Sequence, residues 1–337
     1  MNPQIFRAYD IRGIADTDLT DEVVHRIGRA YATIIRENGG RRVAVGRDCR
    51  LSSERLFAVF SQAIMETGVD VLDIGIGPTP RLYWSVFHLD TDGGVQITGS
   101  HNPAEHNGFK MMLGKGSLHG KKIRSLEHIA RAGAFASAPH PGKLKTYDLA
   151  EAYVADIAGR LHLGPHRLKV AIDGGNGTGG PPAERLLAML GLETVPLFIP
   201  MDGRFPNHHP DPTVEENLVD LRKAVLAEKC DVGIAYDGDA DRIGVLDENG
   251  EVIWGDRLMI VLSRQLLDKH PGATIVGEVK CSKTLFEDIA ARGGRPIMSA
   301  VGHSIIKDRM KEEGALLAGE MSGHIFYKDR WLCFDDA

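Results

Sequence analysis

The feature that most constrains the fold is a regular alternation of short β-branched runs with longer amphipathic stretches. Residues 43–46 (VAVG) are typical of a buried strand, and apolar residues recur at helical spacing over residues 52–66. Alternation of this kind is the pattern of βαβ units, in which a helix connects neighbouring parallel strands. The same pattern predicts further strands at residues 69–74, 94–98, 169–173, 194–198, 232–236, 274–277 and 295–298, and helices at residues 81–87, before Leu190 and at residues 283–291.

Three starts of this kind divide the chain into three α/β units. A chain of 337 residues is too long for one ordinary core. The periodicity lapses in the Gly/Pro/Ala-rich residues 133–142 and in the turn at residues 247–250, where loop-forming residues cluster. We therefore predict three consecutive α/β domains, at residues 1–146, 147–251 and 252–337. The similar openings VAVG, VAID and TIVG suggest a duplicated fold.

Composition and charge predict a soluble protein that binds a small molecule. The chain is 43% hydrophobic and 26% charged, which is average for a globular protein. Its net charge is -6 and it has no long basic run, so nothing predicts a nucleic-acid or membrane partner. No stretch has the apolar length of a signal peptide or a membrane span. The cysteines lie far apart, which favours reduced thiols in a cytoplasmic protein: Cys49, Cys230, Cys281 and Cys333.

Residues 237–242 (DGDADR) place three carboxylates at alternate positions directly after the apolar run 232–236. Alternate side chains of an extended backbone point to one side, and three hard oxygen donors at this spacing suit Mg²⁺ or Ca²⁺. A solvated acidic turn is the simpler alternative. An EF-hand is excluded, because Arg242 stands where that loop requires glycine and strands flank the motif. The pattern therefore favours a divalent-cation site.

Residues 98–103 (TGSHNP) follow another apolar run, at the strand end where α/β sheets usually bind ligands. Ser100 is expected on a tight turn preceded by glycine, with His101 beside it and Lys110 further along the chain. A hydroxyl in this setting can act as a nucleophile or carry a phosphoryl group. A Ser/Asn turn before a helix explains the same residues equally well. Both interpretations stay open at this point.

Other segments carry weaker signals. Arg12, in residues 9–13 (YDIRG), suits a bidentate phosphate contact, although a surface salt bridge is the commoner role. Residues 319–324 (GEMSGH) place an acid, a hydroxyl and an imidazole between glycines that let a ligand approach the backbone. This set fits the hydroxyls of a polyol, and an irregular turn between strands explains it as well. His303, after the strand at 295–298, can likewise be either a site residue or a structural histidine.

A glycine-rich segment at residues 173–180 superficially matches a dinucleotide-binding fingerprint. Its glycines have the required spacing, but Pro181 and Pro182 follow at once. Because proline has no backbone N–H, this helix start has few amides to donate to a pyrophosphate. We therefore interpret the segment as a glycine loop that precedes a helix.

Four segments together, residues 9–13, 98–103, 237–242 and 319–324, resemble the α-D-phosphohexomutase superfamily in their order and separation. The serine loop and the GEMSGH loop look most like those of the bacterial phosphomannomutase/phosphoglucomutase type. Phosphoglucosamine mutases, the alternative within the superfamily, generally have glutamine at the position of Met321. The resemblance spans the chain and implies three consecutive mixed-sheet α/β domains of similar topology. It also implies an isomerase that interconverts the 1-phosphates and 6-phosphates of mannose and glucose.

The resemblance further implies roles for individual residues. Ser100 would carry the phosphoryl group as phosphoserine, and the reaction would pass through a hexose 1,6-bisphosphate. Arg12 would contact the phosphoserine region, and Arg242 would add positive charge to that of Mg²⁺. The implied metal ligands are Ser100, Asp237, Asp239 and Asp241. The candidate general acids or bases are His101, Lys110 and His303. The implied substrate-binding residues are Tyr9, Lys280, Glu320, Ser322 and His324.

Several properties of the whole protein follow from the same resemblance. We expect phosphorylated hexoses as partners, Mg²⁺ as the cofactor, hexose 1,6-bisphosphate as the activator, and a cytoplasmic monomer. Glu320 and Ser322 would bind the 3- and 4-hydroxyls of the sugar. The 2-hydroxyl, at which mannose and glucose differ, would have few contacts with the protein. The superfamily has a fourth, C-terminal domain that binds the distal phosphate. We expect this chain, which stops at Ala337, to lack that domain.

Two functions from other classes remain as alternatives. A metal-dependent phosphatase would explain the acidic motif, but it would leave the serine loop and residues 319–324 without a role. A non-catalytic phosphosugar-binding module would need the sugar contacts and no transfer. Release of inorganic phosphate from a hexose phosphate favours the first alternative, and binding without isomerisation favours the second.

Overall fold

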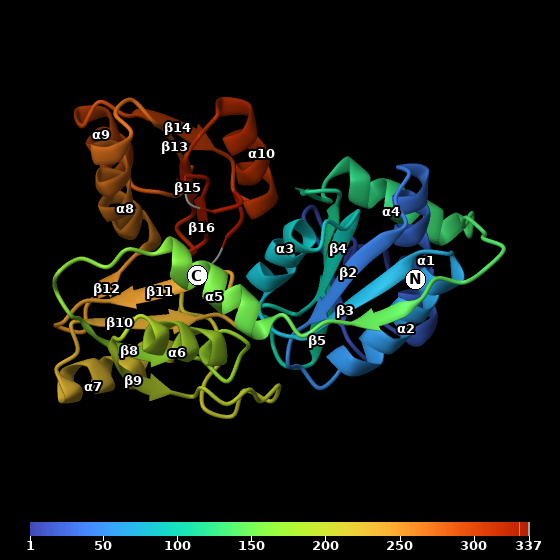
Figure 1. The fold of residues 1–337 in the computed structure, drawn as a ribbon, viewed down its shortest axis with the longest axis horizontal. Helices are drawn as coiled ribbons and strands as arrows, with labels where there is room; N and C mark the ends of the chain where they lie inside the picture. The colour runs from blue at the N-terminus through green and yellow to red at the C-terminus, as the bar shows by residue number, and fades with distance from the viewer. Residues whose placement is uncertain (330, 336–337) are drawn as a thin grey trace. The chain divides into compact units, whose positions relative to one another are not determined.

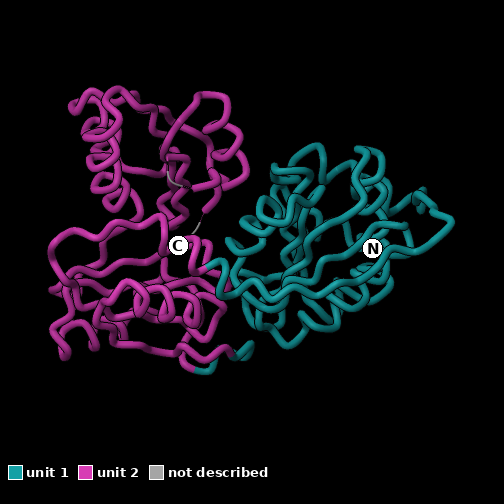
Figure 2. The backbone as a smooth tube through the Cα atoms, in the orientation of Figure 1, with its two compact units in different colours: residues 1–153, 202–206 teal, residues 154–201, 207–337 magenta. Residues whose placement is uncertain are grey.

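Figure 1 shows the computed structural model of the chain, which describes residues 1–329 and 331–335. The chain forms two compact units, one of residues 1–153 with 202–206 and one of residues 154–201 with 207–337 (Figure 2). The first unit contains one β-sheet and the second contains two. Helices connect the parallel strands of all three sheets, so the predicted α/β class is confirmed. The predicted boundaries at residues 146 and 251 stay predictions.

Strands and helices alternate along the chain, and each strand and helix predicted above overlaps an observed one. The strands are β1 Ile11–Ile14, β2 Arg42–Arg47, β3 Asp70–Ile76, β4 Gly93–Ile97, β5 His106–Leu113, β6 Gly116–Ser117, β7 Leu144–Thr146, β8 Lys169–Asp173, β9 Glu193–Leu197, β10 Val232–Tyr236, β11 Ile243–Leu246, β12 Val252–Ile253, β13 Thr274–Glu278, β14 Arg295–Ser299, β15 Leu317–Gly319 and β16 Ile325–Tyr327. The α-helices are α1 Asp21–Glu37, α2 Ser53–Glu66, α3 Thr79–His88, α4 Lys121–Ala132, α5 Ala150–Arg160, α6 Gly180–Met189, α7 Val219–Glu228, α8 Gly255–Lys269, α9 Lys283–Ala291 and α10 His303–Glu313. Short 3₁₀ helices are η1 Pro3–Ile5 and η2 Glu215–Leu218.

The three sheets share one strand order. In each sheet the first parallel strand is central, the second and third lie on either side of it, and an antiparallel strand follows beyond the third. These four strands are β2, β3, β4 and β5 in the first sheet, β8, β9, β10 and β11 in the second, and β13, β14, β15 and β16 in the third. All three sheets are therefore mixed. The repetition confirms the similar topology predicted for the three domains.

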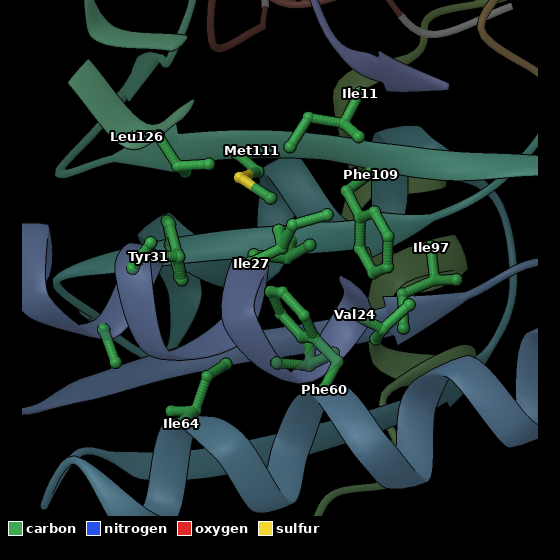
Figure 3. Close-up of a cluster of buried hydrophobic side chains, with 14 of the residues drawn as sticks. Ile11, Val24, Ile27, Tyr31, Phe60, Ile64, Ile97, Phe109, Met111 and Leu126 are labelled. Carbon is green, nitrogen blue, oxygen red and sulfur yellow. The ribbon is translucent and has the colours of Figure 1, made fainter. Parts of the chain in front are cut away.

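The core of the first unit shows why α1 forms and which face it buries. Thr20 caps its N-terminus, and its buried apolar residues recur at helical spacing. Tyr31 of α1 packs on Phe60 of α2, whose ring lies 4.8 Å from that of Phe109 on β5. Burial of each such side chain contributes about 1.5 to 3 kcal/mol. The cluster in Figure 3 includes Ile11, Val24, Ile27, Tyr31, Phe60, Ile64, Ile97, Phe109, Met111 and Leu126.

Residues 202–206 complete the first unit although their neighbours in sequence belong to the second. The backbone at Gly203 lies so close to the Cys49 carbonyl that a Cβ there would collide with it. Two residues later, the ring of Phe205 lies 5.1 Å from the guanidinium carbon of Arg50. This segment therefore covers the loop after β2.

The second unit contains two sheets with separate apolar clusters. One cluster lies between α7 and its sheet, around Leu221, Val225 and Leu246. A second packs α8 and α9 against the third sheet, around Met259 and Leu285. Within the part of the chain that the structure describes, no helix combines the length and the apolar run that a bilayer crossing requires.

Candidate active site

The serine loop, the aspartate loop and the GEMSGH loop lie at equivalent places in the three sheets. Each follows the third parallel strand and leads into the antiparallel strand: residues 98–105 join β4 to β5, residues 237–242 join β10 to β11, and residues 320–324 join β15 to β16. Loops at the carboxyl ends of parallel strands are the usual ligand-binding edge of α/β sheets. The sheet therefore positions all three loops in the same way.

The serine loop holds Ser100 in an uncommon backbone conformation. Ser100 has a φ of 51°, in the left-handed region that non-glycine residues rarely adopt, and it is only 2% exposed. Its N–H donates a 2.8 Å hydrogen bond to Thr98 Oγ1. Its hydroxyl oxygen lies 3.1 Å from Nδ1 of His101. The structure therefore brings the expected nucleophile and one expected acid or base into hydrogen-bond contact.

Arg12 and Lys110 approach the same loop from neighbouring strands. Arg12 lies on β1 opposite Gly108 of β5, and Lys110 is two residues further along β5, so both side chains lie on one face of the sheet. Arg12 Nη1 donates a 3.0 Å hydrogen bond to Asn102 Oδ1 in the serine loop, and Lys110 is 5% exposed. Tyr9, also expected in the site, is half-buried in the segment before β1.

The aspartate loop gathers three buried carboxylates. Asp237 and Asp239 are fully buried and Asp241 is 1% exposed, and one ligand oxygen from each lies within 4.8 Å of the others. Asp237 Oδ1 accepts hydrogen bonds of 3.1 Å from the backbone N–H groups of Asp241 and Arg242. Three carboxylates cannot be buried together at low cost without a compensating cation. The oxygen donor set and its dimensions fit a divalent ion such as Mg²⁺.

His324 links the aspartate loop to the third sheet. Arg242 Nε donates a 3.1 Å hydrogen bond to His324 Nε2, and the other ring nitrogen lies 3.7 Å from Asp241 Oδ1 and 2.7 Å from Asp335 Oδ2. Burial opposes protonation of His324, but the charges of Asp241 and Asp335 outweigh burial and raise its pKa. His303, at the start of α10, stacks on His324 with 5.6 Å between ring centroids.

Glu320 lies beside a second buried carboxylate that the sequence analysis did not single out. Glu320 is 3% exposed and accepts a 2.8 Å hydrogen bond from the Gly302 N–H. Glu278, at the end of β13, is fully buried, and burial together with the charge of Glu320 raises its pKa. Lys280 Nζ lies 3.6 Å from Glu278 Oε1 and is largely exposed. Ser322 is half-buried in the same turn.

The structure therefore forms two groups from the expected residues. In the first unit Ser100, His101 and Arg12 are joined through the serine loop, with Lys110 on the adjoining strand. In the second unit, direct contacts join the aspartate loop and its Arg242 to His324, and His324 to His303. In the same unit, Glu278 lies close to both Glu320 and Lys280. Sequence reasoning missed Arg50, Glu278 and Asp335. The only local signal for Glu278 was its place at the end of an apolar strand.

The glycine loop at residues 174–180 packs against the aspartate loop. As expected, it leads into a helix, α6, which begins at Gly180 with proline in its first turn. A Cβ at Gly177 would lie 2.8 Å from the Gly238 carbonyl oxygen, and Thr178 N–H donates to that same oxygen. The glycines thus let this backbone pack directly on the aspartate loop.

Three family models match the chain in order. Phosphoglucomutase/phosphomannomutase, alpha/beta/alpha domains I, II and III, match residues 3–136, 151–250 and 254–337. A phosphoglucomutase of Neisseria gonorrhoeae is 45% identical over 332 residues, which cover 98% of this chain and 72% of that protein. A phosphomannomutase/phosphoglucomutase of Pseudomonas aeruginosa is 44% identical, with 98% and 71% covered.

The fold comparison agrees with the sequence comparison. The crystal structure of a phosphoglucomutase/phosphomannomutase family protein from Burkholderia thailandensis matches all of this chain and 74% of that one, with a TM-score of 0.95 and 41% identity. Fold, loops and sequence together define a multidomain α/β isomerase. The chain belongs to the phosphoglucomutase/phosphomannomutase family.

Proposed function

We propose that this enzyme interconverts the 1-phosphates and 6-phosphates of glucose and mannose, with Ser100 as the phosphoryl carrier. The observation that carries the proposal is the serine loop. It holds Ser100 at a φ of 51° with its hydroxyl 3.1 Å from His101, in a chain whose curated relatives are named phosphoglucomutase and phosphomannomutase. Strained backbone of this kind is concentrated at functional positions.

The proposed reaction consists of two phosphoryl transfers. In the first, a hydroxyl oxygen of the hexose monophosphate attacks the phosphorus of phosphoserine, the bond from phosphorus to Ser100 Oγ breaks, and the attacking hydroxyl loses its proton to a base. His101, Lys110 and His303 are the candidate bases. In the second, Ser100 Oγ attacks the phosphorus of the other phosphate of the resulting hexose 1,6-bisphosphate, the bond from that phosphorus to the sugar oxygen breaks, and the sugar oxygen gains a proton. The bisphosphate is therefore both intermediate and activator.

The buried aspartates are proposed to bind Mg²⁺. Bound there, Mg²⁺ would supply positive charge for the phosphoryl oxygens, where negative charge spreads in the transition state. Asp237 accepts two backbone N–H groups, which orients its carboxylate within the loop. Arg242 contributes a second positive charge, and its hydrogen bond to His324 orients the guanidinium.

Substrate binding is proposed to involve the turn between β15 and β16. Glu320 and Ser322 would bind the 3- and 4-hydroxyls, which are common to glucose and mannose, so both epimers are substrates. Tyr9, Lys280 and His324 would complete the substrate contacts. We further propose that phosphorylated hexoses are the only partners of a cytoplasmic, monomeric enzyme.

Intact-mass measurement tests the carrier role directly. The purified chain, first treated with phosphatase, is incubated with glucose 1,6-bisphosphate and Mg²⁺. We expect a gain of one phosphoryl group, which peptide mapping places on Ser100. A coupled assay with glucose-6-phosphate dehydrogenase then measures turnover of glucose 1-phosphate. Release of inorganic phosphate without isomerisation would instead identify a phosphatase.

A further inference from the structure

Arg50 is a buried arginine whose hydrogen bonds are concentrated on the serine loop. The residue is 3% exposed and follows β2. Its Nη1 donates to the carbonyl oxygens of Pro103, at 2.5 Å, and His106, at 3.0 Å. Its Nη2 donates to the carbonyl oxygens of Ser100, at 2.7 Å, and Asn102, at 2.6 Å. A guanidinium has five N–H donors, and these bonds use four of them.

The fifth donor connects Arg50 to a carboxylate that contacts the same loop. Arg50 Nε donates to Asp48 Oδ2 at 3.1 Å, and that same oxygen accepts the Gly99 N–H, also at 3.1 Å. Asp48 is 2% exposed, so the two buried charges compensate each other. The arginine therefore contacts three carbonyls of the loop and a fourth at the first residue of β5, and its partner contacts one N–H of the loop.

Close packing excludes other arrangements of this group. A Cβ at Gly99 would lie 2.5 Å from the Arg50 guanidinium carbon, so glycine is required for the guanidinium to lie against the backbone next to Ser100. Phe205, from the segment 202–206, covers the guanidinium at 5.1 Å. The guanidinium thus lies between the Phe205 ring and the backbone of the loop at Gly99.

We propose that Arg50 is a positioning residue for phosphoryl transfer: by binding the carbonyls of Ser100 and its neighbours it holds Ser100 in the left-handed conformation that presents Oγ for reaction. The inference rests on the proposed carrier role of Ser100. The left-handed conformation costs a non-glycine residue of order 1 kcal/mol or more, so it persists only where surrounding contacts impose it. Arg50 supplies such contacts by donating to the carbonyls of Ser100 and Asn102, and Thr98 Oγ1 supplies another by accepting the Ser100 N–H.

The substitution Arg50→Lys distinguishes the effect of the positive charge from the effect of the planar donor geometry. Arg50→Lys keeps the positive charge beside Asp48, but one ammonium nitrogen cannot reach four carbonyls arranged around a planar guanidinium. The matched control is Arg81→Lys. Arg81 is also a buried arginine of the first unit, 7% exposed, and its Nη2 donates to the Ile74 carbonyl on β3 instead of the serine loop.

The test compares wild type, Arg50→Lys and Arg81→Lys in three measurements. These are the rate of Ser100 phosphorylation by glucose 1,6-bisphosphate, the kcat and KM for glucose 1-phosphate, and the melting temperature. For Arg50→Lys we expect phosphorylation and kcat to fall about 100-fold, because small misplacements of a reacting group cost this much. We expect its KM to change less than about threefold, since the proposed sugar contacts are made elsewhere. Arg81→Lys should keep near wild-type kcat.

Several results would contradict the proposed role of Arg50, and they are distinguishable from one another. An Arg50→Lys protein with wild-type kcat and phosphorylation rate overturns it, and so does a loss of kcat that is equal in the two variants. If wild type itself gains no phosphoryl group, the proposed function fails and the inference fails with it. If Arg50→Lys does not fold, Gly99→Ala gives the decision, because its Cβ displaces the guanidinium while all charges remain. Full activity in folded Gly99→Ala overturns the inference.

Discussion

Asp335 Oδ2 lies 2.7 Å from Nδ1 of His324, and Asp335 Oδ1 lies 2.9 Å from the ammonium nitrogen of Lys307. All three side chains are buried. Burial alone would raise the pKa of Asp335, but the charge of Lys307 and the contact with His324 lower it well below the usual range. Since Arg242 donates to Nε2 of His324, a neutral ring carries its proton on Nδ1, the nitrogen that faces Asp335.

The first prediction follows from this buried group. Asp335→Asn keeps the shape of the side chain and removes the negative charge that lies 2.9 Å from the Lys307 ammonium. Loss of one partner of a buried ion pair typically costs about 3 to 5 kcal/mol of unfolding free energy. Urea denaturation measures the loss. The control is Glu287→Gln, which breaks an exposed pair with Lys283 and should cost less than about 0.5 kcal/mol. Equal, small losses in both variants would contradict the assignment.

The second prediction concerns pH and the pair formed by His208 and Asp173. His208 Nε2 lies 3.0 Å from the fully buried Asp173 Oδ2. Burial lowers the pKa of His208, but the hydrogen bond and charge of Asp173 outweigh burial and raise it above the ordinary 6.5. The folded state therefore binds the proton more tightly than the unfolded state. The stabilisation is fully present below about pH 6.5 and is lost as pH rises through the raised pKa.

Denaturation at a series of pH values tests this sign. Between pH 6 and 8 the unfolding free energy of wild type should contain a falling contribution that is absent in His208→Gln. His166→Gln, at an exposed position, serves as the control and should keep the wild-type slope. A His208→Gln profile parallel to that of wild type would show that the pair does not titrate in this range.

The third prediction addresses the phosphoryl carrier. Ser100→Ala should reduce isomerisation of glucose 1-phosphate by roughly 10⁴-fold or more, because no other group replaces the nucleophile. Binding of hexose phosphate, measured by calorimetry, should persist, since Glu320 and Ser322 remain. Ser125→Ala, on the exposed face of α4, is the control for the loss of a hydroxyl. Comparable turnover in wild type and Ser100→Ala would refute the phosphoserine mechanism.

The fourth prediction addresses the cation site. Asp239→Asn removes one of the three carboxylates proposed to bind Mg²⁺, so Mg²⁺ affinity by calorimetry should fall at least tenfold, about 1.4 kcal/mol. Folding should survive, because the loss of one of three buried negative charges lowers the total repulsion within the loop. Asp268→Asn, at an exposed position in α8, should leave the affinity unchanged. A normal melting curve with unaltered Mg²⁺ affinity in Asp239→Asn would remove the metal assignment.

The sequence predicted most of the parallel strands and the helices α2, α3, α6 and α9, because these elements carry a local signal, but it did not predict α7, α10 or β15. β-branched runs such as residues 43–46 are buried on both faces and need no partner to be recognised. The helix α1 was not predicted, although its apolar spacing and its cap at Thr20 are legible in the sequence. The equivalence of the three functional loops was also missed, because it depends on which strands pair. Pairing between distant segments leaves no local pattern.

The residues of the candidate site also differ in whether the local sequence reveals them. The aspartate loop is recognisable because its three carboxylates are near neighbours in sequence. Asp335 and Arg50 are not recognisable, since each acts on residues far away in the chain: Asp335 on Lys307, and Arg50 on the loop of Ser100. The left-handed conformation of Ser100 could not be predicted from the sequence either. Serine does not prefer that conformation, and tertiary contacts impose it.

The segment 202–206 also determines when the first unit can finish folding during synthesis. The unit that contains Ser100 is discontinuous, because roughly 50 residues of the other unit separate Tyr153 from the segment that covers Arg50. At ribosomal rates of ~5–20 residues per second these residues delay the last contacts by roughly 3 to 10 s. During that interval the emerging chain has the sheet and helices of the unit but no Phe205 over the guanidinium. The serine loop therefore reaches its final environment only after β8 and β9 of the second sheet have been synthesised.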